Sequence, residues 1–406
     1  MNHAQAYLQS DETAKHGVDV PNLLQLVFQD AIESGASDVH IEPWEDSIAI
    51  RLRINGVLKE LVHVASEHMD KISGRCKVMG EMVTYQSGLP QEGHSRLGPE
   101  LGNVELRISV FPTTRGEKIV VRLFDPRNRS FDLNNLGFDS TTLGKFVQML
   151  GRTSGLLLLT GPTGSGKTTA IYSALTHLIN LHGSSISVST VEDPVEFNLP
   201  LVAQTQINPA QEFSYARALR SLMRQDPQVI MVGEIRDPET AAIAVQAGLT
   251  GHLVISTIHS GTPAGVFARL INMDIEPFLL ASSIIGVLGV RLLRLNCKNC
   301  ALPCDVEPGY LQILPQEVIS GANFMRSPGC EQCLFTGYSG RSSLSELIAV
   351  DEPIREAVIM KTPTRSITKI AIDNGMTTMW QKGIKKVLTG ETTFEEVYRV
   401  VASEQI

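Results

Sequence analysis

A short segment near the middle of the chain restricts its possible folds more than any other. Residues 161–168 read Gly-Pro-Thr-Gly-Ser-Gly-Lys-Thr and fit the pattern G-x-x-x-x-G-K-[ST]. The apolar run 155–160 precedes the segment, and apolar residues recur at helical spacing from Ala170 to Ile179 after it. A buried strand that leads into a glycine-rich loop and then a helix is the context in which this pattern binds phosphate. We therefore predict a nucleotide-binding α/β domain.

The residue types of this loop suit a nucleoside triphosphate. Glycines let successive backbone N–H groups turn toward phosphate oxygens, and the start of the helix adds a favourable dipole. Lys167 can reach the β- and γ-phosphates, and the Thr168 hydroxyl can ligate Mg²⁺. The alternative is a glycine-rich turn without a ligand. The expected nucleotide-binding residues are Gly161, Pro162, Thr163, Gly164, Ser165, Gly166, Lys167, Thr168 and Thr169.

Three further apolar runs alternate with helical segments, and each leads into polar residues. They span 186–191, 229–232 and 253–258, and they are followed by Glu192, Gly233-Glu234 and His259. This alternation indicates a largely parallel sheet. Ligands of such sheets bind beyond the carboxyl ends of the strands. We therefore expect one site shared by these strand ends.

The strand-end residues are candidate catalytic groups. Gly233 stands where a metal-binding Asp is usual, so Glu234 is the candidate that orients or deprotonates the attacking water. A surface ion pair is the alternative for Glu234, and a solvated acidic turn is the alternative for Glu192. We interpret His259 as a γ-phosphate sensor, whereas His252 fits a structural role equally well.

The first third of the chain has a different pattern. Residues 1–16 are polar and aperiodic, and we expect a flexible tail. Residues 17–125 contain a helical pattern and two predicted hairpins, one of them turning at Asn55-Gly56, so they indicate a small α/β domain. We interpret 126–135 as a linker and 136–406 as the second domain, whose last part is helical from about residue 343.

Arg51, Arg53 and Arg107 alternate with apolar residues on the predicted hairpin strands. A solvated sheet face is the simpler interpretation. The alternative is that these arginines reach a neighbouring subunit's triphosphate, where a planar guanidinium can stabilise charge in the transition state.

Four of the six cysteines form two closely spaced pairs. The pairs are Cys297-x2-Cys300 and Cys330-x2-Cys333. This local spacing matches a structural Zn²⁺ site of four thiolates, in a module of about residues 297–333 inserted in the second domain. Two separate pairs of buried or redox-active thiols are the alternative. The roles of Cys76 and Cys304 stay open.

Composition excludes several classes of protein. A chain of 406 residues with 43% hydrophobic residues is too apolar to be disordered, and its net charge of −8 does not favour direct binding of nucleic acid. The nearly charge-free stretch 278–290 is shorter than a membrane span, and the N-terminus lacks a signal-peptide pattern. We expect a soluble cytoplasmic protein that does not insert into a membrane.

Longer motifs resemble a known family from about residue 18 onward. These motifs cover residues 37–43, 161–169, 190–196, 224–240, 251–259 and 330–341. In content and order they resemble the GspE/PulE-like ATPases of type II secretion and type IV pilus assembly.

The resemblance implies a PAS-like N-terminal domain and a RecA-like ATPase domain that carries the zinc module. It implies a homohexamer that hydrolyses ATP with Mg²⁺ between the two domains. Glu234 would be the catalytic residue, Glu192 a ligand of metal or water, and both His252 and His259 gain support as catalytic residues. The arginines that could supply charge at this site are Arg51, Arg53, Arg107 and Arg122.

The function that the resemblance implies is a motor that powers assembly of a pseudopilus or pilus. Partner proteins would hold it at the inner membrane. The alternatives are a retraction motor, which usually lacks the four cysteines, a motor for DNA uptake or transfer, and an idle nucleotide-binding scaffold. Many relatives carry a further N-terminal docking domain, whereas almost nothing precedes residue 18 here. His94 stands where relatives often have Arg. The system served and the membrane partner therefore stay open.

Overall fold

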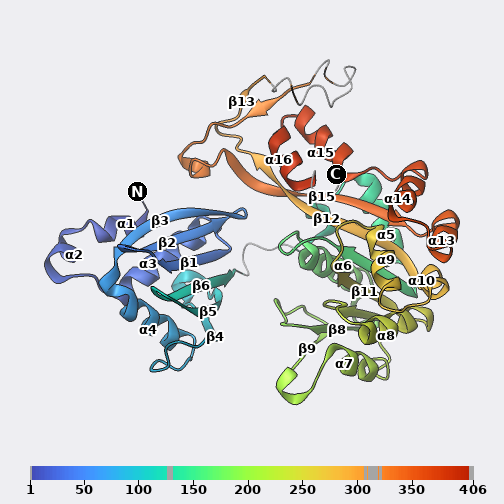
Figure 1. Ribbon diagram of the computed structural model, residues 1–406, viewed down its shortest axis with the longest axis horizontal. Coiled ribbons are helices and arrows are strands. Elements are labelled where there is room, and N and C mark those ends of the chain that lie inside the picture. Colours follow the sequence, from blue (N-terminus) through green and yellow to red (C-terminus); the bar gives the residue numbers. More distant parts are fainter. Residues whose placement is uncertain (1, 126–130, 306–308, 310–318, 320–321, 402–406) are drawn as a thin grey trace. The chain divides into compact units, whose positions relative to one another are not determined.

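The structure, a computed structural model, describes residues 2–125, 131–305, 309, 319 and 322–401. The chain forms two compact units, residues 1–129 and residues 130–406, which we call unit 1 and unit 2 (Figure 1). Each unit has its own hydrophobic core. Within the described ranges, no helix is both long enough and apolar enough to cross a membrane.

Unit 1 is built on a six-stranded antiparallel sheet with the strand order β3-β2-β1-β6-β5-β4. Helices α3 and α4 pack their apolar residues against one face of this sheet. The strands are β1 (Asp38–Pro43), β2 (Ser47–Ile54), β3 (Val57–Ala65), β4 (Gln91–Arg96), β5 (Glu105–Thr113) and β6 (Gly116–Phe124). The helices are α1 (His3–Leu8), α2 (Asp11–His16), α3 (Val20–Glu33) and α4 (Met69–Met79).

The local sequence explains the hairpins of unit 1. Strand β2 ends at Ile54 and β3 begins at Val57, so the two residues between them form the predicted turn. Both have positive φ, 50° at Asn55 and 84° at Gly56, which suits these residue types. Because strand side chains alternate between faces, the buried isoleucines of β2 leave its arginines on the opposite, polar face.

The expectation of a flexible tail over residues 1–16 is wrong for residues 3–16, which form α1 and α2. Helix α1 contacts α3, because the backbone N–H groups of His3 and Ala4 each donate to the Asp30 carboxylate at 2.9 Å. Apolar periodicity could not reveal α1, since hydrogen bonds to a buried carboxylate hold its first turn.

Unit 2 is built on a seven-stranded sheet with the order β15-β12-β7-β11-β10-β8-β9. The six strands from β12 to β9 are parallel, and β15 is antiparallel to β12. The largely parallel sheet that the sequence predicts is therefore confirmed. The strands are β7 (Gly155–Thr160), β8 (Val188–Glu192), β9 (Val202–Gln206), β10 (Val229–Val232), β11 (Leu253–Ile258), β12 (Ile284–Asn296) and β15 (Tyr338–Ala349).

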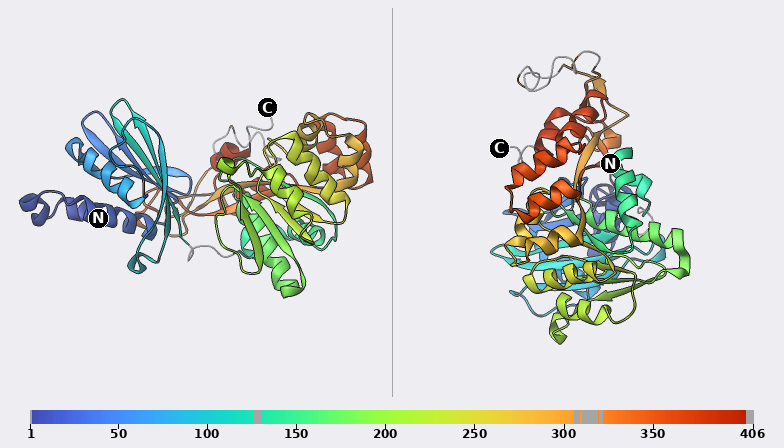
Figure 2. Two further views of the ribbon diagram at one scale, coloured as in Figure 1. Left: turned by 90° about the horizontal axis from the view of Figure 1, so that it is seen from below. Right: turned by 90° about the vertical axis from the view of Figure 1, so that its right-hand side faces the viewer.

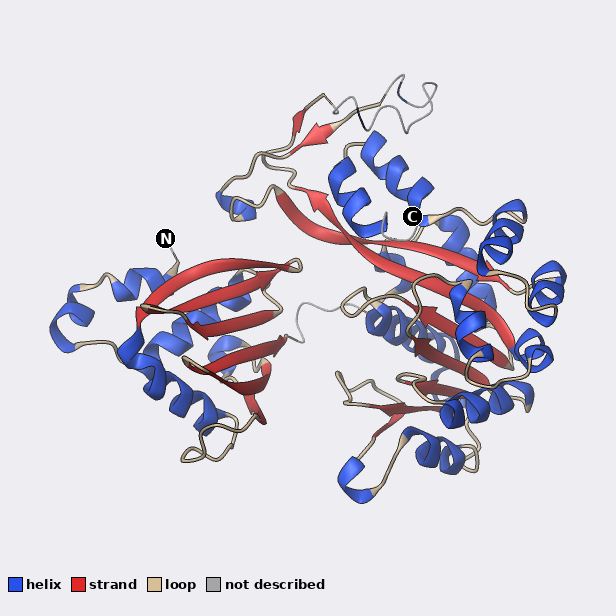
Figure 3. Cartoon of the chain, viewed as in Figure 1, coloured by secondary structure: helices blue, strands red, loops and turns tan. Residues whose placement is uncertain are grey.

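Helices cover both faces of this sheet (Figures 2 and 3). Helices α5 and α6 share a core with one face, and α7 to α10, α13 and α14 share a core with the other. Helices α15 and α16 form a smaller core with β12 and β15. The helices are α5 (Ser140–Leu150), α6 (Lys167–His182), α7 (Tyr215–Leu222), α8 (Pro238–Leu249), α9 (Gly265–Ile271), α10 (Pro277–Ser283), α13 (Glu352–Ile359), α14 (Thr364–Asp373), α15 (Met379–Leu388) and α16 (Phe394–Val401).

The apolar stretch 278–290 contains most of α10 and the first half of β12. One part of unit 2 differs from the sequence interpretation. Residues up to Ala349 belong to β15, so the helical C-terminal part begins later than residue 343. Serines and a glutamate interrupt the apolar pattern of β15, which is why the strand was missed.

The structure describes only part of the predicted linker and only part of the predicted zinc module. Of the predicted linker 126–135, residues 126–130 lie outside the described residues. Leu133 is buried in the core of unit 2, so this part of the predicted linker is packed. Near the cysteines, the short strands β13 (Leu302–Pro303) and β14 (Met325–Arg326) pair with each other. Much of the predicted module between them lies outside the described residues.

The contact of α1 with α3 gives a first testable prediction. Asp30→Ala removes an acceptor that is 6% exposed and leaves two backbone N–H groups without it. We expect a loss of about 1–3 kcal/mol in the free energy of unfolding of unit 1 and faster hydrogen exchange at the amides of α1. Asp11→Ala, at an exposed position that begins α2, is the control. Unchanged exchange in α1 after Asp30→Ala would contradict the docking of this helix.

Candidate functional site

The glycine-rich loop between β7 and α6 has the backbone that its sequence predicts. Gly161, Gly164 and Gly166 have φ of 151°, 75° and 96°, in the region that side chains rarely adopt. A Cβ at Gly161 would lie 2.4 Å from the carbonyl oxygen of Val290 in β12. The first glycine is therefore required by close contact with the neighbouring strand as well as by φ.

Lys167 is the first residue of α6 and folds back over the loop. Its Nζ donates to the carbonyl oxygens of Gly161 at 2.7 Å and Pro162 at 2.9 Å. Burial lowers the pKa of this ammonium, and the Glu234 carboxylate acts in the opposite direction. Lys167 and Glu234 therefore lie within electrostatic reach of each other, as expected for one shared site.

Glu234 lies two residues beyond the end of β10, and two basic side chains, His259 and Arg236, contact its carboxylate. Its Oε1 lies 3.0 Å from Nε2 of His259, the residue that follows β11. Its Oε2 accepts a hydrogen bond from Nε of Arg236 at 2.6 Å. The Glu234 side chain is 13% exposed, whereas His259 is 49% exposed. The structure thus brings together Glu234 and His259 and adds Arg236, which the sequence interpretation did not include.

Gly233 is explained by a residue that sequence reasoning missed. A Cβ at Gly233 would lie 2.8 Å from the hydroxyl oxygen of Tyr215, the first residue of α7, and 3.3 Å from the carbonyl oxygen of Val191. The Tyr215 hydroxyl therefore fills the space that a side chain at this strand end would need. Burial raises the pKa of Tyr215, and the carboxylate of Asp193 raises it further. No spacing rule connects Tyr215 to Gly233, because only the packing of α7 brings them together.

Glu192 is the last residue of β8 and is 3% exposed. Its carboxylate accepts hydrogen bonds from the hydroxyl of Tyr172 in α6, from Thr190 Oγ1 at 2.5 Å and from Gln204 Nε2 at 3.1 Å. Three donors from three elements therefore hold this carboxylate in place. The contact with Tyr172 fixes the second turn of α6 to the carboxyl end of β8.

His252 lies at the opposite edge of the sheet from Glu234 and His259. It precedes β11, and its carbonyl oxygen accepts from the N–H of Gly155, the first residue of β7. Its Nδ1 lies 3.2 Å from the carbonyl oxygen of Ala247 at the end of α8. A six-residue strand is about 20 Å long, so within this chain His252 is not brought together with the strand-end residues.

The arginines of unit 1 lie on its polar sheet face in ion pairs. Arg107 of β5 is paired with Glu92 of β4 at 2.6 Å. Arg51 is paired with Glu42. Arg53 and Arg122 both contact Asp38, at 3.6 Å and 2.9 Å. These pairs fit the interpretation of a solvated, charged sheet face, and any contact with a triphosphate would have to replace them.

The four cysteines predicted to bind zinc lie together. Their sulfur atoms are all within 4.8 Å of one another, and three of the pairs are 3.8–3.9 Å apart. Thiolates at the corners of a tetrahedron, about 2.3 Å from a zinc ion, are about 3.8 Å apart. The Asn299 amide donates to Cys330 Sγ at 3.4 Å and lowers the pKa of that thiol to about 6. The donor set and its spacing fit a structural Zn²⁺ site.

The other two cysteines are separate from this cluster. Cys76 of α4 is fully buried in the core of unit 1, and burial raises the pKa of its thiol to about 12. It is therefore a core residue. Cys304 is partly exposed, and its backbone N–H donates to the carbonyl of Phe324.

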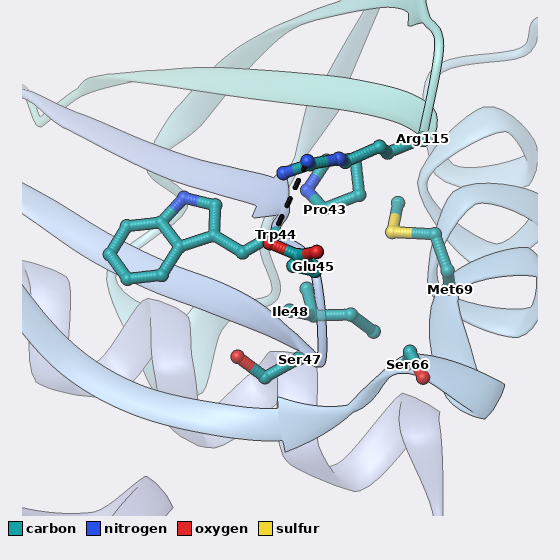
Figure 4. Close-up of a pocket in the computed structure, with 8 residues that line it drawn as sticks. All are labelled: Pro43, Trp44, Glu45, Ser47, Ile48, Ser66, Met69 and Arg115. Atoms are coloured by element: carbon teal, nitrogen blue, oxygen red, sulfur yellow. Dashed lines mark ion pairs between the residues drawn. The ribbon is translucent and has the colours of Figure 1, made fainter.

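A pocket of about 310 Å³ in unit 1 contains none of the predicted site residues (Figure 4). Two charged residues line it, Arg115 and Glu45, and they are paired with each other at 3.8 Å. The remaining lining residues are Pro43, Trp44, Ser47, Ile48, Ser66 and Met69. The strand-end site of unit 2 is therefore the better candidate for chemistry.

Known proteins are similar to this chain along most of its length. The family model described as Type II/IV secretion system protein matches residues 13–399. Type II secretion system protein E of Pectobacterium carotovorum subsp. carotovorum is 40% identical over 398 residues, which are 97% of this chain and 78% of that protein. Type IV pilus assembly ATPase PilB of Thermus thermophilus is 39% identical over 392 residues, which are 96% of this chain and 43% of that protein.

A solved structure has the same fold at lower identity. The ATPase DotB of Legionella pneumophila is 19% identical, with a TM-score of 0.70 over 94% of this chain and 96% of that one. At this identity the similarity concerns the fold alone.

The contact between Gly233 and Tyr215 predicts a specific pair of effects. Gly233→Ala should lower the free energy of unfolding by about 1–3 kcal/mol, because the added methyl group meets the Tyr215 hydroxyl. In the background of Tyr215→Phe, which removes that oxygen and keeps the ring, the same substitution should cost less. Urea unfolding followed by circular dichroism measures both. An equal loss in the two backgrounds would show that the hydroxyl does not limit this position.

Proposed function

The chain belongs to the Type II/IV secretion system protein family, and from this premise we propose that it is an ATP-hydrolysing motor for pseudopilus or pilus assembly. The observation that carries the proposal is the pairing of Glu234 with His259 at 3.0 Å, within electrostatic reach of Lys167 in the phosphate-binding loop. A carboxylate beside a phosphate-binding lysine is the arrangement that activates water against a terminal phosphate.

In the proposed mechanism, ATP replaces contacts that the chain now makes with itself. Lys167 exchanges the carbonyl oxygens of Gly161 and Pro162 for the β- and γ-phosphate oxygens. The backbone N–H groups of residues 164–168 and the start of α6 add further donors. The exchange is favourable because an ammonium binds a charged phosphate oxygen more strongly than it binds a neutral carbonyl oxygen.

Glu234 is proposed to orient the attacking water and to accept its proton. Oxygen Oε1 contacts His259 and Oε2 accepts from Arg236, which leaves each oxygen a further lone pair that can accept a hydrogen bond from water. His259, half exposed and beside Glu234, is placed to report the presence of the γ-phosphate. Glu192 acts as a positioning residue, since its carboxylate holds Tyr172 of α6 and accepts from three donors.

Mg²⁺ and Zn²⁺ belong to the proposal as cofactors. Thr168, partly buried in the first turn of α6, offers a hydroxyl oxygen of the kind that Mg²⁺ binds. When bound with ATP, the ion neutralises developing charge on the phosphates. The four clustered cysteines would hold Zn²⁺ as a structural ion.

The proposal extends to the assembly in which the chain works. From the family we infer a homohexamer with a PAS-like unit 1, in which arginines such as Arg107 supply charge to the nucleotide. Partner proteins of a secretion or pilus machine would hold it at the inner membrane.

Substitution of Lys167 or Glu234 tests the site. Lys167→Ala and Glu234→Gln should each lower phosphate release from ATP by at least about 100-fold. Glu234→Gln should keep its affinity for ATP, because the change leaves the loop intact, whereas Lys167→Ala should weaken it. Glu239→Gln, at an exposed residue of α8 paired with Arg220, should keep full activity. Full activity of both Lys167→Ala and Glu234→Gln would overturn the assignment.

The zinc site is tested by metal content. We expect one zinc ion per purified chain by mass spectrometry, and Cys330→Ser should lose the ion and lower the midpoint of thermal unfolding. Cys304→Ser, which changes a nearby cysteine outside the cluster, should keep both. Purified chain without zinc, or Cys330→Ser with its zinc retained, would refute the assignment.

A further inference from the structure

A buried arginine of β12, Arg291, lies behind the phosphate-binding loop and has no part in the mechanism above. The residue is 8% exposed. A Cβ at Gly161 would lie 3.0 Å from its Nη1, and its Nη2 donates to the carbonyl oxygen of Gly261 at 2.8 Å. Gly261 belongs to the loop that follows His259. The guanidinium group therefore lies between the first residue of the phosphate-binding loop and the loop that carries His259.

These two loops are also joined by a pair of hydrogen bonds between Thr160 and Ser260. Thr160 Oγ1 donates to the carbonyl oxygen of Ser260 at 2.9 Å and accepts from its N–H at 3.0 Å. Arg291 supports the same two loops in another way. Its planar guanidinium group donates to Gly261 in the His259 loop and lies against Gly161, where a Cβ would meet its Nη1.

The position also places a second cation beside Lys167. The charge of Arg291 acts with burial to lower the pKa of Lys167. Burying a guanidinium is costly unless its N–H groups are bonded, and Arg291 donates to Val290 and Gly261 carbonyl oxygens. The charge also reaches Glu346 of β15, whose pKa burial raises and Arg291 lowers. A buried positive charge behind the loop favours a polyanionic ligand in front of it.

We propose that Arg291 is a positioning residue for ATP hydrolysis. Its guanidinium group anchors the His259 loop through Gly261 and packs against Gly161 of the phosphate-binding loop, and its charge strengthens nucleotide binding. The inference rests on the proposed function. Arg291 would then have two separable effects: its geometry would affect the rate of ATP hydrolysis, and its charge would affect the affinity for nucleotide.

Two substitutions separate these effects. Arg291→Lys keeps the charge and loses the planar guanidinium group, so we expect kcat for ATP to fall by about tenfold, with the Kd for a fluorescent ADP changed by less than about twofold. Arg291→Gln loses the charge as well, so the Kd for ADP should also rise by about tenfold. The control is Arg294→Lys, on the same strand, where a mostly buried arginine is paired with Glu396 at 2.5 Å in a different core.

The outcomes distinguish positioning from a purely structural role. Arg294→Lys should lower the midpoint of thermal unfolding and leave kcat and the Kd unchanged. If Arg291→Lys likewise lowers only the midpoint of thermal unfolding and leaves kcat unchanged, the proposal is overturned. Arg291→Lys alone gives this result, so the test holds even if Arg291→Gln does not fold. If Lys167→Ala hydrolyses ATP normally, the proposed function itself fails. If Lys167→Ala loses activity and Arg291→Lys keeps it, only the proposed role of Arg291 is refuted.

Discussion

Parallel pairing of β7 with β11 and β12 is the constraint on which the rest of the site depends. The register places Thr160 beside Ile258 on one side and beside Gly289 on the other. The residues that follow β7 and β11 therefore emerge at one edge, where the glycine-rich loop and the His259 loop meet Arg291 of β12. A slip of one residue in either pairing would turn side chains to the opposite face and separate these groups. The fully buried leucines of β7 hold the register from both cores.

Much of unit 2 could be predicted because its signals are local. The runs 155–160, 229–232 and 253–258 are strands with those bounds, since continuous apolar sequence between polar ends specifies a buried parallel strand. The loop at 161–168 likewise combines glycines at positive φ with a lysine that begins a helix. By contrast, helix 3–8 depends in part on Asp30 of a distant helix, which no local pattern reveals. Helices 3–8 and 11–16 do have local signals, because Asn2 and Ser10 cap them, but each is too short to show apolar periodicity.

The candidate site was predictable in its residue types and less so in its contacts. Glu234 and His259 follow adjacent strands, so their proximity follows from the topology. The same reasoning fails for His252, because a residue before a strand lies at the other edge of the sheet. Tyr215 and Arg291 were missed for a common reason: each acts through packing between elements that are distant in sequence. Arg236 lies only two residues from Glu234, and no motif assigns it a role. Lys167 and both carboxylate oxygens of Glu234 make contacts within the chain, and the proposed mechanism exchanges the contacts of Lys167 for phosphate oxygens.

The central claim is that the strand-end residues of this chain hydrolyse ATP rather than only bind it. Phosphate release by the purified chain, measured over a range of ATP concentrations with Mg²⁺ and again with excess EDTA, tests the claim most directly. The account predicts release that saturates with ATP and stops when the metal ion is removed. Saturable binding of ATP with no phosphate release in the presence of Mg²⁺ would contradict it and would leave a nucleotide-binding scaffold.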